Sequence, residues 1–257
     1  MKLFKKTALL IIVSCILLGC VSKKKIVYFQ NDSIDQAKVS NSYSTIFKPD
    51  DLLQITISSA DINAVKPFNL PAATYSLLSD NVIGQPSQQM YLIDNQGYIE
   101  FPVFGRIKVG GLTRIEAIKM FKKKLSPDYV KDPTINIRIS NFKVTIIGDV
   151  KKPGTYTIPN ERITIVEALG LAGDLNISGV RNDVQVTREE NGKKIIYNVD
   201  LLSKKTYTSP VFYLQQNDFI YVKPNNAKVQ SASYNQNTGL FISIASVLIS
   251  LITIITR

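Results

Sequence analysis

Cys20 is the residue whose surroundings point most clearly to covalent chemistry. Three lysines open the chain: Lys2, Lys5 and Lys6. An apolar stretch follows over residues 7–18, an order that is typical of a secretory signal peptide. It ends in Leu17-Leu18-Gly19-Cys20, where a small residue precedes a thiol that could take a diacylglycerol group. We therefore expect signal-peptide cleavage after Gly19 and lipidation of Cys20, as in bacterial lipoproteins; the alternative is an uncleaved anchor helix with an incidental cysteine.

A second stretch with suggestive spacing lies at the other end of the sequence. Residues 240–256 carry no charge, and hydroxyl side chains recur among them every three or four positions: Ser243, Ser246, Ser250, Thr253 and Thr256. On an α-helix this spacing gathers the hydroxyls in one stripe and leaves aliphatic side chains elsewhere. We expect a transmembrane helix over residues 239–257, in which several copies could surround a lumen. The candidate pore-lining residues are Ser243, Ser246, Ser250 and Thr253.

The same stripe has other interpretations. Small hydroxyl residues also mediate close packing between membrane helices, and their side chains often bond to the backbone of their own helix. A plain anchor therefore stays open as an alternative to a pore.

The residue inventory disfavours catalysis. The chain has no histidine, which removes the commonest general base, the commonest metal ligand and every Ser-His-Asp arrangement. Its two cysteines, Cys15 and Cys20, both lie at the signal region, so the mature chain would have no disulfide and no other thiol. The adjacent Asp50 and Asp51 would point to opposite sides of a strand. We expect no catalytic residue, no metal site and no cofactor.

The charge of the chain favours anionic partners. The formal net charge is +11, and without the signal-peptide lysines 28 basic residues stand against 20 acidic ones, a charge of +8. Phospholipid head groups or an acidic glycan would suit such a balance. Nucleic acid is not expected, because no part of the sequence is similar to a known nucleic-acid module.

The body between the two ends begins with a segment of strands and one helix. Leu53, Ile55 and Ile57 alternate with polar residues, as in a half-buried strand. Residues 91–101 predict a hairpin that turns at residues 94–97. Thr113 and Glu116 form a capping box at the start of a helix. The apolar face expected for this helix consists of Ile115, Ile118, Phe121 and Leu125. A strand with Ile135, Ile137 and Ile139 closes the segment.

A second segment repeats this order. A strand from residue 142 and a return strand over residues 155–158 enclose a Lys-Pro-Gly turn. Thr164 and Glu167 form another capping box, opening a short helix. Strands at 183–188 and 194–199 flank Asn191-Gly192, a strong hairpin signal. We expect an α+β fold with two small mixed-sheet domains, each covered by one helix, followed by the transmembrane helix.

Several motifs, in order, resemble a known pair of domains. Lys48-Pro-Asp-Asp-Leu-Leu-Gln-Ile-Thr-Ile57, Asp94-Asn-Gln-Gly-Tyr-Ile-Glu-Phe-Pro-Val-Phe-Gly105 and Gly111-Leu-Thr-Arg-Ile-Glu-Ala117 are similar to the polysaccharide biosynthesis/export domain. Asn141-Phe-Lys-Val-Thr-Ile-Ile-Gly-Asp-Val-Lys-Lys-Pro-Gly-Thr-Tyr-Thr-Ile158 and Gln216-Asn-Asp-Phe-Ile-Tyr-Val222 are similar to the soluble-ligand-binding β-grasp (SLBB) domain. Family members often have Gly-Asp where this chain has Asp50-Asp51 and Asn217-Asp218.

The resemblance implies a domain organisation and a function. The expected parts are a signal peptide (1–19), a lipidated tether (20–44), an export domain (45–139), an SLBB β-grasp domain (140–225), a linker (226–238) and the transmembrane helix (239–257). The implied protein is an outer-membrane lipoprotein with its body in the periplasm. It would form a homo-oligomeric ring that exports capsular polysaccharide or exopolysaccharide through an α-helical barrel. Its implied partners are the polysaccharide polymer and an inner-membrane polysaccharide co-polymerase.

Two other function classes stay open beside this translocon. One is a tail-anchored periplasmic module that binds a glycan or a protein and has no pore. The other is a periplasmic glycan-modifying enzyme, which the missing histidines and tryptophans disfavour.

Overall fold

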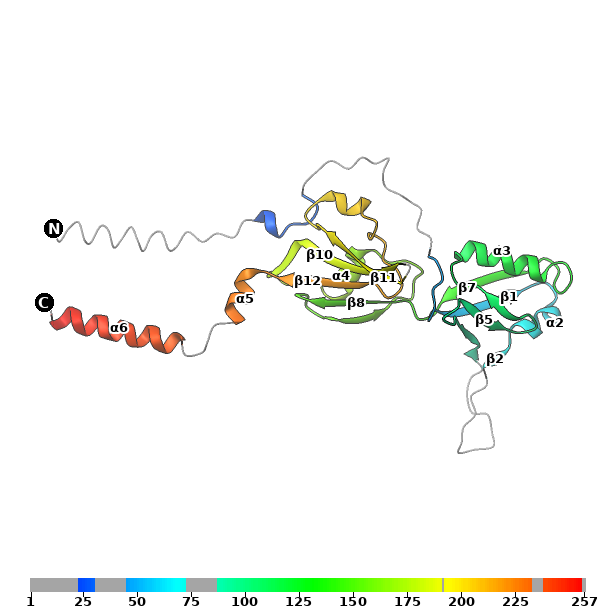
Figure 1. Cartoon of the computed structure of the whole chain (residues 1–257), viewed down its shortest axis with the longest axis horizontal. Coiled ribbons are helices and arrows are strands. Elements are labelled where there is room, and N and C mark those ends of the chain that lie inside the picture. The colour runs from blue at the N-terminus through cyan, green and yellow to red at the C-terminus, as the bar shows by residue number, and fades with distance from the viewer. Residues whose placement is uncertain (1–22, 31–44, 73–86, 191, 233–237, 256–257) are drawn as a thin grey trace, which may run out of the picture.

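The computed structural model describes residues 23–30, 45–72, 87–190, 192–232 and 238–255. Two sheet-containing domains lie side by side along the molecule, and two helices extend beyond the second one (Figure 1). We call residues 45–140 the first domain and residues 141–225 the second domain. Each has its own cluster of buried hydrophobic side chains.

The first domain is built around strand β1 (Leu52–Ser58), which lies between β4 (Met90–Leu92) and β7 (Thr134–Ile139) in an antiparallel sheet. Leu53 pairs with Ile139 and Ile55 with Ile137. The predicted alternation of β1 is confirmed, because Leu53, Ile55 and Ile57 are buried. Strand β7, which the sequence predicts, forms one edge of this sheet.

Smaller elements complete the first domain. They are α2 (Ile62–Val65), η3 (Lys66–Phe68), β2 (Pro71–Ala72), β3 (Ser87–Gln88), β5 (Tyr98–Phe101) and β6 (Gly105–Lys108). A turn does lie at residues 94–97, where the Gly97 N–H donates to the Asp94 carbonyl. However, β5 pairs with β6 and β4 pairs with β1, so the predicted hairpin over residues 91–101 is wrong in its partners. The sequence signal for the turn is local, whereas the choice of partner depends on strands far along the chain.

Helix α3 (Arg114–Leu125) begins at the predicted capping box, in which the side chains of Thr113 and Glu116 bond to each other's backbone N–H. Ala117, Phe121 and Leu125 are its buried residues. Ile115 was expected on this buried face, but its side chain is 62% exposed. Its side chain lines a pocket between the two domains instead, so the core-facing side of α3 begins at Ala117.

The second domain contains a five-stranded mixed sheet with the strand order β11-β10-β12-β8-β9. The strands are β8 (Lys143–Gly148), β9 (Gly154–Thr157), β10 (Gly179–Glu190), β11 (Lys193–Val199) and β12 (Phe219–Pro224). β12 and β8 run parallel, and the other pairs are antiparallel. The hairpin predicted at Asn191-Gly192 joins β10 to β11, and Gly192 has a positive φ of 71°.

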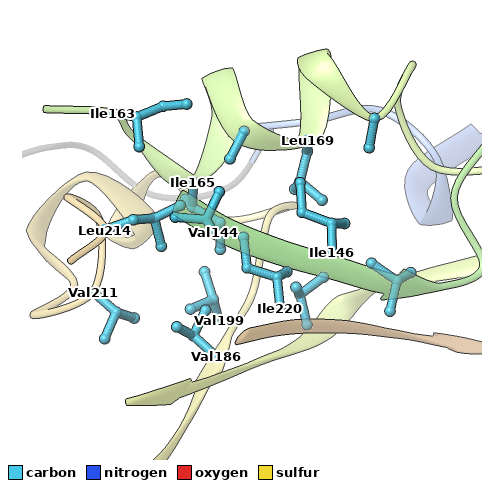
Figure 2. Close-up of a cluster of buried hydrophobic side chains, with 14 of the residues drawn as sticks. Val144, Ile146, Ile163, Ile165, Leu169, Val186, Val199, Val211, Leu214 and Ile220 are labelled. Atoms are coloured by element: carbon cyan, nitrogen blue, oxygen red, sulfur yellow. The ribbon is translucent and has the colours of Figure 1, made fainter. Parts of the chain in front are cut away.

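Helix α4 (Ile165–Leu171) covers one face of this sheet. Its N-terminus has the predicted capping box of Thr164 and Glu167. Figure 2 shows Ile165 and Leu169 of α4 packed over Val144 and Ile146 of β8, with Ile220, Val186 and Val199 from the neighbouring strands. A short 3-10 helix, η4 (Lys204–Thr208), lies between β11 and β12.

The last part of the chain forms α5 (Asn226–Ala232) and α6 (Thr238–Ile255). A transmembrane helix was expected over residues 239–257. Among the residues that the structure describes, no helix has both the length and the apolar character needed to cross a membrane, so this expectation is wrong. At 1.5 Å per residue, the 18 residues of α6 extend for about 27 Å, less than the ~30 Å of a typical hydrocarbon core.

Candidate functional site

Chemically distinctive residues gather where the two domains meet. In the first domain, the chain turns at residues 48–51 before β1. Asp50 takes a left-handed conformation (φ 68°), and the Asp51 N–H donates to the Lys48 carbonyl at 3.2 Å. The Asp51 side chain is 0% exposed and accepts the Lys48 N–H at 2.8 Å. Its other oxygen, Oδ1, has no hydrogen-bond donor among the described residues, and burial raises the pKa of Asp51 to about 6.

The second domain makes a similar turn before β12. Asn217 has φ 64°, the Asp218 N–H donates to the Gln215 carbonyl at 3.1 Å, and Asp218 Oδ2 accepts the Gln215 N–H at 2.7 Å. Here a counterion is present, because Arg188 Nη2 lies 2.7 Å from Asp218 Oδ2. The two side chains are only 4% and 1% exposed.

Hydrogen bonds join these turns across the domain junction. The side chain of Asn141 accepts the Leu52 N–H at 2.9 Å and donates to the Asp50 carbonyl at 2.8 Å. Lys48 Nζ donates to Gln215 Oε1 at 3.0 Å, so the first turn contacts the second one directly. Because these bonds satisfy backbone and side-chain groups of both domains, they hold the junction in one geometry.

A pocket of about 580 Å³ also lies at the junction. The first domain contributes the start of α3 and the end of β7, and the second domain contributes residues 157–161. Phe47, Phe142 and Ile137 are buried side chains at its apolar part. Arg114 of α3 pairs with Glu161 of the second domain at 3.2 Å, which bridges the two walls.

The polar lining of the pocket is rich in side chains that bind oxygen-rich ligands. It comprises Thr45, Gln54, Thr113, Arg114, Arg138, Ser140, Thr157, Asn160 and Glu161. The exposed Ile115 also lines the pocket, which explains why it is absent from the core. With two guanidinium groups and one carboxylate, the lining carries a net positive charge.

None of the predicted site residues that the structure describes lines this pocket. Cys20 and the signal peptide fall outside the described residues. Ser243, Ser246, Ser250 and Thr253 are exposed on α6. The hydroxyls of the last three donate to carbonyls of their own helix: Ser246 to Ser243, Ser250 to Ser246, and Thr253 to Ile249. Their contacts match the backbone-bonding alternative, and the pore-lining role stays a prediction.

The segment after Cys20 packs on the second domain. It includes η1 (Lys23–Lys25) and residues 26–30. The Phe29 N–H donates to the Leu201 carbonyl, Tyr28 donates its hydroxyl to Asp174, and Arg181 lies over the Tyr28 ring. On α5, Lys228 pairs with Asp149 of the same domain. Val150, next to Asp149, pairs with Leu175, next to Asp174, so the segment after Cys20 and α5 both attach to one region of the second domain.

Sequence reasoning missed the junction pocket. Its residues are scattered over five parts of the chain and carry no shared spacing. Arg138, one of the two arginines of the pocket, occupies a polar position in a predicted strand. Such a position by itself indicates only that the side chain faces solvent. One sequence signal was available at the first turn of α3. Arg114 follows the capping residue Thr113 immediately, which places its side chain at the start of the helix, where the pocket lies.

Comparisons with known proteins bear on both domains. Residues 39–140 match the family described as polysaccharide biosynthesis/export protein, and residues 142–222 match the SLBB domain. A relative from Ralstonia solanacearum, EPS I polysaccharide export outer membrane protein EpsA, is 31% identical over 162 residues. The protein with the same description from Ralstonia nicotianae is 30% identical over 161 residues.

The extent of these matches is limited to part of each relative. Both alignments cover 60% of this chain and 42% of the relative, so the chain spans less than half the length of the curated relatives it matches. The domains implied by the sequence motifs are nevertheless both present and in the expected order. The chain therefore contains a polysaccharide biosynthesis/export domain followed directly by an SLBB domain.

Proposed function

We propose that this protein is a subunit of the apparatus that exports a capsular or extracellular polysaccharide across the bacterial outer membrane. The observation that carries the proposal is the tandem of an export domain and an SLBB domain, matched over residues 39–140 and 142–222. The two relatives from Ralstonia, both described as polysaccharide export outer membrane proteins, support the same role. We propose a transport role without catalysis.

Lipidation of Cys20 is part of the proposal, and it has a consequence for orientation. Residues 26–30 follow Cys20 closely and contact the second domain through Leu201 and Asp174. A lipid on Cys20 would therefore hold the second domain near the membrane. The first domain would then extend into the periplasm, where an inner-membrane co-polymerase could reach it.

Assembly of several copies into a ring is also proposed. The junction pocket, at about 580 Å³, has the size of a small-molecule site and could not thread a hydrated polymer. A conduit for the polymer would therefore have to be enclosed between subunits. The mass of the detergent-extracted protein tests this directly: a discrete assembly of several subunits is expected, and a monomer at working concentrations would contradict the ring.

The test of the export role is deletion and complementation in the source organism. Without the gene, extracellular polysaccharide should fall sharply, and the full chain supplied on a plasmid should restore it. Cys20→Ser is expected to leave the protein in the soluble periplasmic fraction and to reduce export. Normal export from the deletion strain would refute the proposed function.

A periplasmic binding module without a conduit is the second candidate. The oxygen-binding side chains at the junction pocket favour it specifically. The mass measurement separates the two, since a binding module has no need of a ring.

A further inference from the structure

We propose that the pocket between the two domains binds an acidic sugar residue, such as a uronate, of the exported polymer. This inference rests on the proposed export function and names the chemistry of the polymer that the site would recognise. Residues of a single chain line the pocket on both sides, so the site does not depend on assembly of a ring.

Arg138 is the side chain that selects for an acidic group. It lies on β7 opposite Gln54 of β1, on the solvent-facing side of the sheet. No hydrogen bond or ion pair joins its guanidinium to another residue in the described part of the chain. A planar guanidinium that lines a pocket and is not already paired can bind a carboxylate through two parallel hydrogen bonds.

The second arginine is held in place by the protein itself. Arg114 pairs with Glu161 across the pocket, so one guanidinium is neutralised while Arg138 keeps its charge. Gln54 and Asn160 add neutral donors and acceptors to the lining. Such a set suits a ligand with one carboxylate and many hydroxyls better than a ligand with several negative charges.

The free edge of β7 adds backbone groups to the same wall. The Ser140 N–H donates to the Leu52 carbonyl, so residues 140, 138, 136 and 134 direct their backbone groups toward β1. The alternate residues Ile137 and Ile139 therefore direct theirs outward, along the side that lines the pocket. Within the described residues these outward groups have no hydrogen-bond partner, and sugar hydroxyls can both donate to and accept from them.

A peptide strand fits this place less well. The pocket reaches only the end of β7, with two outward-facing residues, whereas an added strand is usually five or six residues long. The exposed apolar surface of Ile115 suits the non-polar face of a sugar ring. The volume leaves room for more than one ring, as expected for a site that contacts a short stretch of polymer.

The test compares two trisaccharides on the full mature chain purified in detergent. Binding of trigalacturonate and of neutral galactotriose is measured by isothermal titration calorimetry. We expect the wild-type protein to bind trigalacturonate more tightly than galactotriose. Arg138→Gln should weaken trigalacturonate binding about tenfold or more, because a charge-assisted contact is lost, and should change galactotriose binding little.

Lys131→Gln is the matched control, since it removes one positive charge from an exposed residue of the same domain that does not line the pocket. It should leave both affinities unchanged. Thermal unfolding of each variant shows that the fold is retained.

Three results would overturn the proposal. They are no binding of trigalacturonate to the wild-type protein, equal affinity for the two trisaccharides, and an Arg138→Gln variant that binds trigalacturonate as well as the wild type does. A lower subunit number in Arg138→Gln without an effect on sugar binding would assign the pocket to a contact between copies instead. If sugar binding fails, export can still depend on the gene, and the proposed function is unaffected. Normal export from the deletion strain, in contrast, refutes the proposed function itself.

Discussion

The turn at Asp51 in the first domain and the turn at Asp218 in the second have nearly the same backbone hydrogen bonds but different electrostatic surroundings. In both, a residue with positive φ precedes a buried aspartate that starts a strand. In both, the aspartate accepts the N–H of the residue three positions earlier and donates its own N–H to that residue's carbonyl. The difference lies in the counterion, because Arg188 pairs with Asp218 whereas Asp51 Oδ1 has no donor among the described residues.

This comparison separates two roles of a buried carboxylate. The turn geometry requires only an acceptor for one backbone N–H, which a neutral side chain could also supply. The charge itself is stabilised only where a cation accompanies it, since desolvation of an unpaired charge is costly. We therefore expect the second domain to depend on Asp218 as the counterion of Arg188, whereas burial of Asp51 without a cation should cost stability.

The largest effect is expected from removing the paired charge. Asp218→Ala leaves Arg188 buried without its counterion and should lower the free energy of unfolding of the second domain by about 3–5 kcal/mol. Chemical denaturation followed by circular dichroism measures this loss. Asp183→Ala, which breaks the more exposed pair with Lys223, is the control and should cost less than about 1 kcal/mol. Equal losses in the two variants would show that the buried pair has no special role.

The unpaired aspartate should make stability depend on pH in a definite direction. Because burial raises the pKa of Asp51 to about 6, the folded state binds its proton more tightly than the unfolded chain does. The protonated Asp51 side chain therefore stabilises the fold fully below about pH 3.9, the pKa of an aspartate in the unfolded chain. This stabilisation is lost as the pH rises through about 6, and the free energy of unfolding falls by up to about 3 kcal/mol.

Asp51→Asn removes this titration while keeping an acceptor for the Lys48 N–H. The difference in unfolding free energy between Asp51→Asn and wild type should shift in favour of the variant from about pH 4 to pH 8. Asp50→Asn, at the exposed neighbouring position, is the control and should show no such shift. A constant difference for Asp51→Asn across this range would mean that Asp51 is not destabilised by burial.

The helix caps of the two domains provide a comparison in which equal effects are expected. Thr113→Ala and Thr164→Ala each remove a side-chain acceptor from a capping box with the same contacts. Each should lower the unfolding free energy of its domain by about 1 kcal/mol, as measured by thermal denaturation. Serine at either position should restore most of the loss, and a failure of serine to do so would point to the methyl group rather than the cap.

The smallest effect concerns the residues with positive φ in the two turns. Asp50→Gly and Asn217→Gly should each raise stability by about 0.5 kcal/mol or less, because glycine adopts the left-handed conformation without strain but gains freedom in the unfolded chain. Alanine at the same positions should destabilise by about 1 kcal/mol. If alanine is tolerated as well as glycine is, the left-handed conformation does not limit these turns. Asp and Asn are the residues that best tolerate the left-handed conformation after glycine, which agrees with their presence at positions 50 and 217.

Local patterns in the sequence were sufficient for most of the individual elements. The alternation of Leu53, Ile55 and Ile57 predicted a buried strand face, and the Thr-x-x-Glu spacing at Thr113 and Thr164 predicted the start of two helices. These features depend on residues two or three positions apart, whose geometry is set by the backbone of one element. The family motifs were equally informative because they extend over both domains.

Arrangements between distant parts of the chain were decided only by the tertiary structure. In it, Arg188 pairs with Asp218, and β5 pairs with β6 rather than with β4. Ile115 lies in the junction pocket instead of the core. The tertiary structure also shows the hydroxyls of Ser246, Ser250 and Thr253 bonded to their own helix, in a segment whose composition had predicted a membrane span. Periodicity states which residues share a face of one element, but what covers that face depends on packing between elements far apart in sequence. For this reason the sequence by itself determined most of the elements and the resemblance to the two domains, whereas the pocket, with Arg138 in its lining, exists only where the two folded domains meet.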